Sequence, residues 1–141
     1  MSLKMNVALD AYAGLPNRAH ETDAGLDLYC RKSRLVWPWS HVIFDTGVHI
    51  ELPHGYWGKI ESKSGLNTKW NIVSCGGTID EGYTGSIKVK LYNLGWKFYW
   101  FRKGDKIAQL VITPYLAPEL NWVDKLDETP RGDGGFGSTG R

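Results

Sequence analysis

Apolar and polar residues alternate along much of the chain, which is typical of half-buried β-strands rather than of amphipathic helices. Over Val42–Leu52 the even positions are mostly apolar, whereas the odd positions include Asp45 and Glu51. A glycine in the middle of this segment, Gly47, predicts a bend in the strand. Ser86–Asn93 alternates in the same way. Shorter segments of this kind predict further strands over Asn6–Leu9, Gly25–Cys30, Arg34–Trp37, Tyr56–Glu61, Lys97–Phe101, Ile107–Ile112 and Leu120–Val123.

Turn-forming residues separate these segments at short intervals, as in Pro53-His54-Gly55 and Lys103-Gly104-Asp105. Many short strands at this spacing predict an all-β protein with a jelly-roll-like β-barrel or sandwich. No segment carries a sustained helical stripe, and a short helix fits only over Ser64–Lys69, with Ser64 as its N-cap. We expect one domain, with a β-barrel core over residues 1–123 and a connector and C-terminal arm over 124–141.

The C-terminal end differs in composition from the strands before it. Residues 131–141 are nearly half glycine and contain one aromatic residue, Phe136, between two arginines. Such a segment buries too little apolar surface to fold by itself. It is either a disordered tail or a lid, in which backbone N–H groups approach phosphate oxygens and Phe136 offers a flat face to a base.

Composition and charge exclude several classes of protein. The chain has 141 residues, of which 42% are hydrophobic and 23% charged, and its net charge is +2. These values disfavour a disordered chain and a strongly basic nucleic-acid-binding protein, but they allow local binding of one small polyanion. No apolar run approaches the roughly 20 residues that span a bilayer, and the N-terminus has no apolar signal core. We therefore expect a cytoplasmic or nuclear protein, in an infected host cell if its source is viral.

Cysteines and histidines do not suggest a metal centre. Cys30 and Cys75 are too few for a disulfide framework or a four-thiolate site. The four histidines show no paired spacing of metal ligands; they are His20, His41, His49 and His54. We expect structural or surface roles for all six residues.

Five short motifs, spread over most of the chain, carry most of its candidate functional residues. Any one of them alone is weak evidence, but in this order and spacing they resemble the trimeric dUTPase family (deoxyuridine 5'-triphosphate nucleotidohydrolases). The fifth motif is the most specific. The motifs are Ala24–Leu28, Lys63–Leu66, Gly77–Gly85, Gly104–Leu110 and Arg131–Ser138.

The resemblance implies a reaction, a cofactor and an assembly. The family hydrolyses dUTP to dUMP and pyrophosphate by attack of water on the α-phosphorus, with Mg²⁺ bound to the triphosphate. It implies a dUTPase-like β-clip and a homotrimer whose subunits share each active site. No nucleic acid is implied as a substrate, and no membrane as a partner.

By this resemblance, three residues serve the reaction itself. Asp80 is the base for the attacking water, Gln109 lies near the α-phosphate or the water, and Asp27 reaches Mg²⁺ through water. Each has a simpler alternative. Asp80 could be a turn residue, Gln109 a strand amide bonded to backbone, and Asp27 a strand-end residue in a surface turn.

The uracil and the sugar are expected to be read by the third motif and the segment before it. Tyr83 would pack beneath the deoxyribose and exclude a 2'-hydroxyl, unless it is an ordinary strand tyrosine. Ser74 and Gly77 would lie in a hairpin arm, whose backbone groups match the edge of uracil. Cytosine would leave buried polar groups of this arm unpaired.

The phosphates are expected to contact the second motif and the tail. Lys63 would neutralise charge, while Ser64 and Gly65 would donate hydrogen bonds at the start of a short helix. The tail would close over the site, with Phe136 on the uracil and the remaining donors on the β- and γ-phosphates. Those donors are Arg131, Gly137, Ser138 and Thr139.

Two positions depart from the family pattern. Lys63 stands where the family usually has arginine, which keeps the charge but loses the planar fork of donors. Asn67 stands where a small residue is common. We expect altered affinity or phosphate geometry rather than lost chemistry.

Two rival functions remain open. One is a dCTP deaminase-like enzyme, although that family lacks the C-terminal motif and the Asp-x-x-Tyr pairing seen at Asp80 and Tyr83. The other is a nucleotide-sensing regulatory protein on the same fold. Four tryptophans outside the motifs, which we expect in the core or at subunit interfaces, are Trp37, Trp39, Trp96 and Trp100.

Overall fold

Short antiparallel strands make up most of the molecule. The structure is a computed structural model that describes residues 2–140, and the predicted all-β class is confirmed there, with one short helix. The elements in chain order are β1 (Asn6–Leu9), β2 (Gly25–Tyr29), β3 (Arg34–Val36), β4 (Ser40–Asp45), β5 (Val48–Glu51), β6 (Tyr56–Glu61), α1 (Ser64–Trp70), β7 (Ile72–Ser74), β8 (Thr78–Ile79), β9 (Lys88–Asn93), β10 (Tyr99–Phe101) and β11 (Lys106–Pro114).

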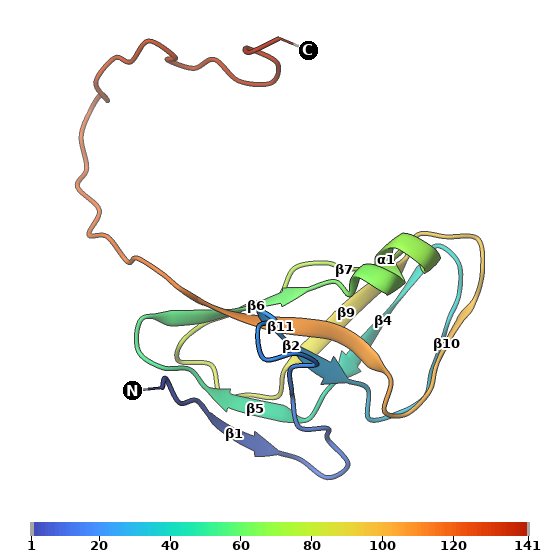
Figure 1. Cartoon of the computed structure of the whole chain (residues 1–141). Helices are drawn as coiled ribbons and strands as arrows, with labels where there is room; N and C mark the ends of the chain where they lie inside the picture. Colours follow the sequence, from blue (N-terminus) through green and yellow to red (C-terminus); the bar gives the residue numbers. More distant parts are fainter. Residues whose placement is uncertain (1, 141) are drawn as a thin grey trace.

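Two larger sheets enclose the core. One has the strand order β2-β11-β6-β8 and the other β4-β9-β7, and two-stranded sheets of β1 with β5 and of β3 with β10 lie beside them. Figure 1 shows β2, β6 and β11 passing across β4 and β9. The side chains between them are almost fully buried; they include Leu28, Phe44, Val89, Leu91, Phe101, Ile107 and Leu110.

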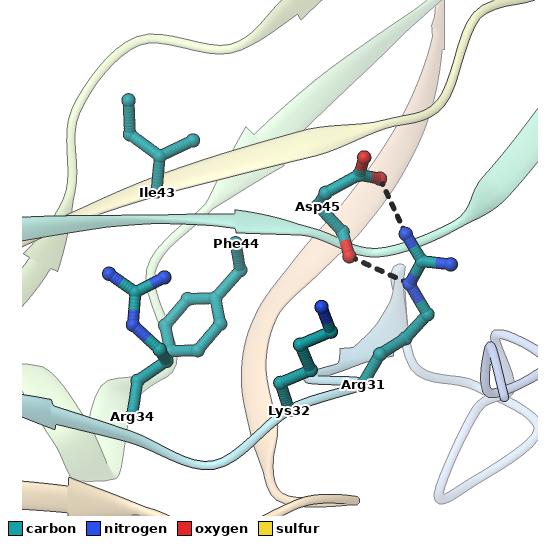
Figure 2. A pocket seen from close by; sticks show the side chains of 6 residues that line it. All are labelled: Arg31, Lys32, Arg34, Ile43, Phe44 and Asp45. Carbon is teal, nitrogen blue, oxygen red and sulfur yellow. Dashed lines mark hydrogen bonds and ion pairs between the residues drawn. The ribbon is translucent and has the colours of Figure 1, made fainter.

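The strand predicted over Val42–Leu52 is interrupted at Gly47, and its halves join different sheets. β4 pairs with β9, whereas β5 pairs with β1. Gly47 has a φ of +67°, and a Cβ there would lie 2.8 Å from the Arg31 guanidinium. Arg31 in turn binds Asp45, with Nη2 3.2 Å from the carboxylate and Nε 3.0 Å from the main-chain oxygen (Figure 2). The predicted bend is therefore a break that only glycine accommodates easily.

The short helix is confirmed, but its predicted N-cap is wrong. Lys63, in an extended conformation, occupies the N-cap position and makes no side-chain capping bond, and Ser64 is already helical. α1 ends at Asn71, whose φ of 55° is left-handed. The reason is tertiary, because the Lys63 side chain is held by a residue of another strand, described below. No helix within residues 2–140 is long and apolar enough to cross a membrane.

The other predicted strands differ in how well they match. Asn6–Leu9 and Tyr56–Glu61 are confirmed to the residue, whereas the strand predicted over Leu120–Val123 is wrong. β11 ends at Pro114, and the chain then runs away from the barrel (Figure 1). Leu120 and Trp122 are both 91% exposed, so their apolar character finds no partner strand. β7 and β8 are too short to produce a recognisable alternation.

Candidate active site

Three neighbouring strands bring the first, second and fourth motifs together. Gln109 of β11 is paired with Asp27 of β2 on one side and with Glu61 of β6 on the other. A Cβ at Gly25 would lie 2.2 Å from Gln109 Oε1, so this position requires glycine for the glutamine side chain to fit. Asp27, Gln109 and Glu61 are thus neighbours across three strands, and Lys63 follows two residues after Glu61.

The Asp27 carboxylate lies between two lysines. Lys63 Nζ is 2.5 Å from Oδ1 and Lys106 Nζ is 3.1 Å from Oδ2, while Asp27 itself is only 4% exposed. Burial is the largest single influence and would raise the pKa of Asp27, but the two ammonium groups together lower that pKa below 3.8. The carboxylate in turn raises the pKa of Lys106. This cluster is therefore ionised and carries one net positive charge.

The simpler alternative for Asp27, a strand-end residue in a surface turn, is wrong, because Asp27 lies within β2. Lys106 was missed from the sequence, where it is only one of many lysines. No local pattern links it to a carboxylate in a strand so distant along the chain.

The Gln109 carboxamide is held by the main chain at the end of β6. Its Nε2 donates to Ser62 O at 3.0 Å, and Ser62 Oγ accepts the Ser74 N–H at 2.9 Å. Within one chain, Gln109 therefore has the simpler of its two predicted roles, that of a strand amide bonded to the backbone. Ser64 and Gly65 come next along the chain and are exposed, and a Cβ at Gly65 would meet no atom within 4 Å. Space for a ligand therefore exists beside the lysine cluster.

Asp80 lies on a tight turn that directly follows β8. The Tyr83 N–H donates to Asp80 O at 3.0 Å, which closes the turn. The Tyr83 hydroxyl donates to Ser86 O at 2.9 Å, and a Cβ at Gly85 would lie 2.6 Å from that hydroxyl. Tyr83 lies between β8 and β9, so the alternative of an ordinary strand tyrosine is wrong. The hydroxyl hydrogen bond holds the Tyr83 ring in place, and the residue remains 44% exposed.

Glu81 anchors this turn to the barrel. Its carboxylate accepts hydrogen bonds from the Tyr115 hydroxyl at 2.5 Å and the Gly55 N–H at 3.0 Å, and His54 Nδ1 lies 2.8 Å away. These bonds, that of Tyr115 foremost, lower the pKa of Glu81 from 4.5 to about 2. Sequence reasoning missed this role, because all three partners lie far from Glu81 along the chain.

The third motif borders a groove along β6 and β8. One part, of about 490 Å³, is lined by Trp57, Thr78, Asp80, Glu81, Gly82 and Tyr115. An adjoining part, of about 250 Å³, shares Trp57 and Thr78 and reaches Ser74 and Gly77. Gly77 has a φ of +108°, and a Cβ there would lie 2.6 Å from Ile60. Glycine at this position therefore allows the segment to pack closely against β6.

The predicted hairpin arm is present in part. β7 forms an antiparallel pair with β9, in which Ser74 is opposite Leu91. Beyond Ser74, however, the chain crosses to the other sheet, where the Ile60 N–H donates to Gly77 O at 2.9 Å. The two glycines at 76 and 77, both with positive φ, make this crossing possible.

One chain keeps the two clusters apart. Gln109 is opposite Glu61 at one end of β6, whereas Ile79 is opposite Gly58, so Asp80 lies beside Trp57. Four positions along a strand correspond to about 13 Å. The predicted base is therefore distant from Asp27 and Gln109 within the same chain.

The tail contacts neither cluster. The last main-chain bond to the barrel is from the Tyr115 N–H to Gly55 O, at 3.0 Å. Farther along, Arg131 Nε donates only to Gly134 O at 2.8 Å, and Phe136 is fully exposed with a φ of 47°. Figure 1 shows this segment extending away from the barrel. The remaining predicted donors, Gly137, Ser138 and Thr139, lie on it as well.

The residues offer no preformed metal cage. Within residues 2–140 no three His, Cys, Asp or Glu side chains lie close enough together to hold a metal ion. The carboxylate predicted to reach Mg²⁺, that of Asp27, is already bound by two ammonium groups.

Comparison with known proteins identifies relatives over nearly the whole chain. A family model described as dUTPase matches residues 11–140. A deoxyuridine 5'-triphosphate nucleotidohydrolase of Clostridium tetani is 43% identical over 131 residues, which cover 92% of this chain and 90% of that protein. The Staphylococcus bacteriophage 80alpha dUTPase with dUPNHPP superposes with a TM-score of 0.89 at 32% identity, over 99% of this chain and 100% of that one.

A further similar structure contains a bound metal ion. A mutant dUTPase from phage phi11 of S. aureus, which shows the coordination of a structural Mg(II) ion, superposes with a TM-score of 0.82 at 29% identity. The match covers 87% of this chain and 98% of that one. The resemblance carried by the five motifs and the predicted jelly-roll-like fold are thereby confirmed.

Proposed function

The chain belongs to the dUTPase family, and on that basis we propose that it hydrolyses dUTP to dUMP and pyrophosphate at active sites shared between three copies. The observation that carries the proposal is the separation of the site residues within one chain. Asp27, Lys63 and Gln109 lie at one end of β6 and Asp80 at the other, while the tail contacts neither. A second copy supplying the Asp80 groove and a third supplying the tail would complete each site.

The charge of the lysine cluster suits a triphosphate. Lys63 and Lys106 outnumber the one carboxylate between them, so the cluster attracts anions. The Ser64 hydroxyl and the Gly65 N–H are exposed beside it and can donate to phosphate oxygens. Lys63 acts here as a point charge, shared between Asp27 and the incoming phosphates, rather than as a bidentate fork.

Asp80 is suited to the proton transfer. Its carboxylate borders an open groove, on a turn that Glu81 holds in place. In the proposed step Asp80 takes a proton from water as the water oxygen bonds to the α-phosphorus. The bond from that phosphorus to the bridging oxygen breaks, and pyrophosphate leaves with the bond's electron pair. General-base assistance of this kind contributes about 10²–10⁴-fold.

Selectivity follows from the neighbouring parts of the groove. The backbone around Ser74 and Gly77 reads the edge of uracil, and Tyr83 lies beneath the deoxyribose. Because the Tyr83 hydroxyl is bound to Ser86 O, the ring cannot swing aside to admit a 2'-hydroxyl. The phage 80alpha structure, determined with dUPNHPP, supports a nucleotide ligand for this fold.

Magnesium fits this arrangement only together with the nucleotide. When bound, Mg²⁺ supplies neutralisation of the triphosphate charge. In this chain Asp27 would reach it through water, and the substrate phosphates would hold it directly. Because the lysine cluster is net positive, the protein alone does not attract a free cation there. The structural Mg(II) ion of the phi11 dUTPase shows that a protein of this fold coordinates magnesium, which supports Mg²⁺ as the cation proposed here.

The tail is proposed to close the site. Arg131 would pair with the β- and γ-phosphates, Phe136 would stack on uracil, and the Gly137 N–H with Ser138 and Thr139 would donate to phosphate oxygens. Its detachment from the barrel is consistent with a segment that folds only onto a bound nucleotide.

Mixing two inactive chains tests whether the site is shared. Chains with Asp80→Asn and chains with Gln109→Ala are each expected to release little pyrophosphate alone. Refolded together in equal amounts, they form mixed trimers in which about a quarter of the sites combine one intact Gln109 with one intact Asp80. Activity restored to roughly that fraction supports the proposal. No restoration means that both residues of a site come from one chain.

Comparing nucleotides tests the activity itself. We expect pyrophosphate release from dUTP in large excess over dCTP, dTTP and UTP. Ammonia release from dCTP would instead indicate a deaminase. Binding of dUTP without turnover would indicate a regulatory sensor.

A further inference from the structure

The small sheet of β3 and β10 carries apolar side chains on both of its faces. On the inner face Val36 and Phe101 are buried. The outer face continues the alternation beyond the strand ends and carries six large apolar side chains, which are 40–81% exposed. We call these six residues the aromatic ladder; they are Leu35, Trp37, Trp39, Trp96, Phe98 and Trp100.

The ladder has three cross-strand rungs. Trp100 is opposite Leu35 in the strand register. Continuing outward, the rings of Trp37 and Phe98 lie 4.4 Å apart, and those of Trp39 and Trp96 lie 5.4 Å apart. Both ring pairs meet edge to face, a geometry that covers the face of only one ring in each pair. Flat aromatic faces are therefore presented to solvent along the ribbon.

The four ladder tryptophans were predicted to lie in the core or at subunit interfaces, and their exposure excludes the core. None of the ladder residues belongs to a motif of the active site. In Figure 1, β10 lies at the end of the barrel opposite the point where the C-terminal segment leaves. A contiguous exposed apolar surface of this size marks a site of interaction.

The charge around the ladder is predominantly positive. Residues 31–45 and 94–105, which form β3, β4, β10 and the adjoining segments, contain six Lys and Arg against two carboxylates, those of Asp45 and Asp105. Because the whole chain is only +2, the rest of it is net negative. Among residues 2–140, only Arg31 of these six forms an ion pair, with Asp45. Figure 2 shows Arg31, Lys32 and Arg34 gathered around one cavity beside β4, together with Asp45, which binds Arg31.

We propose that the aromatic ladder and its flanking cations bind single-stranded nucleic acid, at a site separate from the nucleotide-hydrolysing one. Bases would stack on the tryptophan and phenylalanine rings, and phosphates would pair with exposed cations at the edges of the ribbon, among them Lys97 and Arg34, which is opposite Phe101. Aromatic side chains that project from adjacent strands stack bases in this way, and cations beside them follow the backbone.

The charges disfavour a second copy of the chain that pairs through the same face. Such pairing would bring two sets of six cations together, with only two carboxylates from each copy to offset them. An acidic protein segment matches the charge, but five of the six ladder side chains are flat rings, on which every nucleobase can stack. Nucleic acid satisfies both features at once.

Fluorescence anisotropy with a labelled deoxyadenosine oligomer of about 12 nucleotides tests the proposal in the full-length protein. Adenine avoids competition from a uracil-selective pocket, and saturating dUPNHPP should leave the binding unchanged. We expect binding that weakens steeply with salt and at least about tenfold weaker binding of a duplex of equal length.

Substitutions on and off the ladder provide the matched comparison. Trp96→Ala and Trp37→Ala should each weaken binding about 5–100-fold, as for the loss of one stacking partner. Trp122→Ala removes a still more exposed tryptophan from the connector and should change nothing. Hydrolysis of dUTP by Trp96→Ala should equal that of the wild type.

A charge variant keeps the test decisive if a tryptophan variant misfolds. Arg34→Gln combined with Lys97→Gln should lower the slope of log affinity against log salt by about 1.4, since each phosphate contact contributes about 0.7 for a single strand. The proposal is overturned by no binding at about 50 mM salt. It is equally overturned by unchanged affinity in all of these variants, by displacement with dUPNHPP, or by equal affinity for a glutamate oligomer.

Discussion

Asp27 and Asp80 are both carboxylates assigned to the same reaction, yet their surroundings are opposite. Asp27 is buried within a strand and held between two ammonium groups, whereas Asp80 is exposed on a turn at the edge of a groove. The first is thus a fixed charge that organises its neighbours. The second borders an open groove. The comparison teaches that burial and partners, not residue type, distinguish the surroundings of the two carboxylates.

Removing the tail should produce the largest effect, because the proposed tail contacts involve both the base and the phosphates of the nucleotide. Deleting residues 131–141 should lower kcat/KM for dUTP by several orders of magnitude, since several charge-assisted donors at about 1.5–3 kcal/mol each are lost. The assembly should survive, because residues 131–140 make no hydrogen bond to the barrel. Gel filtration and a urea melt test assembly. Wild-type turnover by the truncated protein would mean that the tail is only a disordered terminus.

Asp80→Asn should affect chemistry alone. The amide is nearly isosteric but cannot accept the proton of the water, so kcat should fall by about 10² or more. Stability should be unchanged, because the Asp80 side chain is exposed and only its main-chain oxygen closes the turn. Steady-state pyrophosphate release and a urea melt measure the two quantities. A near-normal kcat would remove Asp80 from the role of base.

Asp27→Asn, unlike Asp80→Asn, should lower the stability of the fold. Neutralising this carboxylate leaves two lysines facing an amide, and the free energy of unfolding should fall by about 1–2 kcal/mol, less than for a fully buried pair because both lysines reach solvent. Asp124→Asn, in the exposed connector, is the matched control and should be neutral. Urea melts at neutral pH make the comparison. Equal stability of both variants would show that the lysines do not depend on Asp27.

Glu81→Gln should have the smallest effect and should be visible mainly as a change in pH dependence. The pKa of Glu81 is about 2 when folded and 4.5 ordinarily, so its ionisation stabilises the fold above pH 4.5. That stabilisation disappears as the pH falls from 4.5 towards 2. The glutamine variant should therefore lose less stability than the wild type over this range. Parallel curves of melting temperature against pH for the two proteins would contradict the assignment.

Local patterns were sufficient where an element depends on its own residues. The alternation over Tyr56–Glu61 predicted β6 to the residue, because one face of that strand is buried and the other reaches solvent. The glycines at 25 and 77 belong to the motifs, and each adjoins a side chain that would collide with a Cβ. The five motifs were likewise readable from the sequence, since each is a short continuous segment.

Local patterns failed where partners lie far apart along the chain. The alternation over Leu120–Val123 resembles a strand, yet no neighbouring strand is available there, and Trp122 remains exposed. Ser64 has the chemistry of an N-cap, but the Lys63 contact with Asp27 places the helix start one residue earlier. The ladder tryptophans are apolar enough for a core, yet the inner face of the same ribbon already fills it.

The sequence by itself therefore determined the all-β class, the family and the candidate residues of the site, because these depend on short-range periodicity and on motifs. Only the tertiary structure decided that Lys106 neutralises Asp27, that Glu81 fixes the Asp80 turn, and that Asp80 and Gln109 lie at opposite ends of β6. Strand register and the contacts between distant segments set these relations. They arise from packing of the whole barrel, which no local stretch of residues encodes.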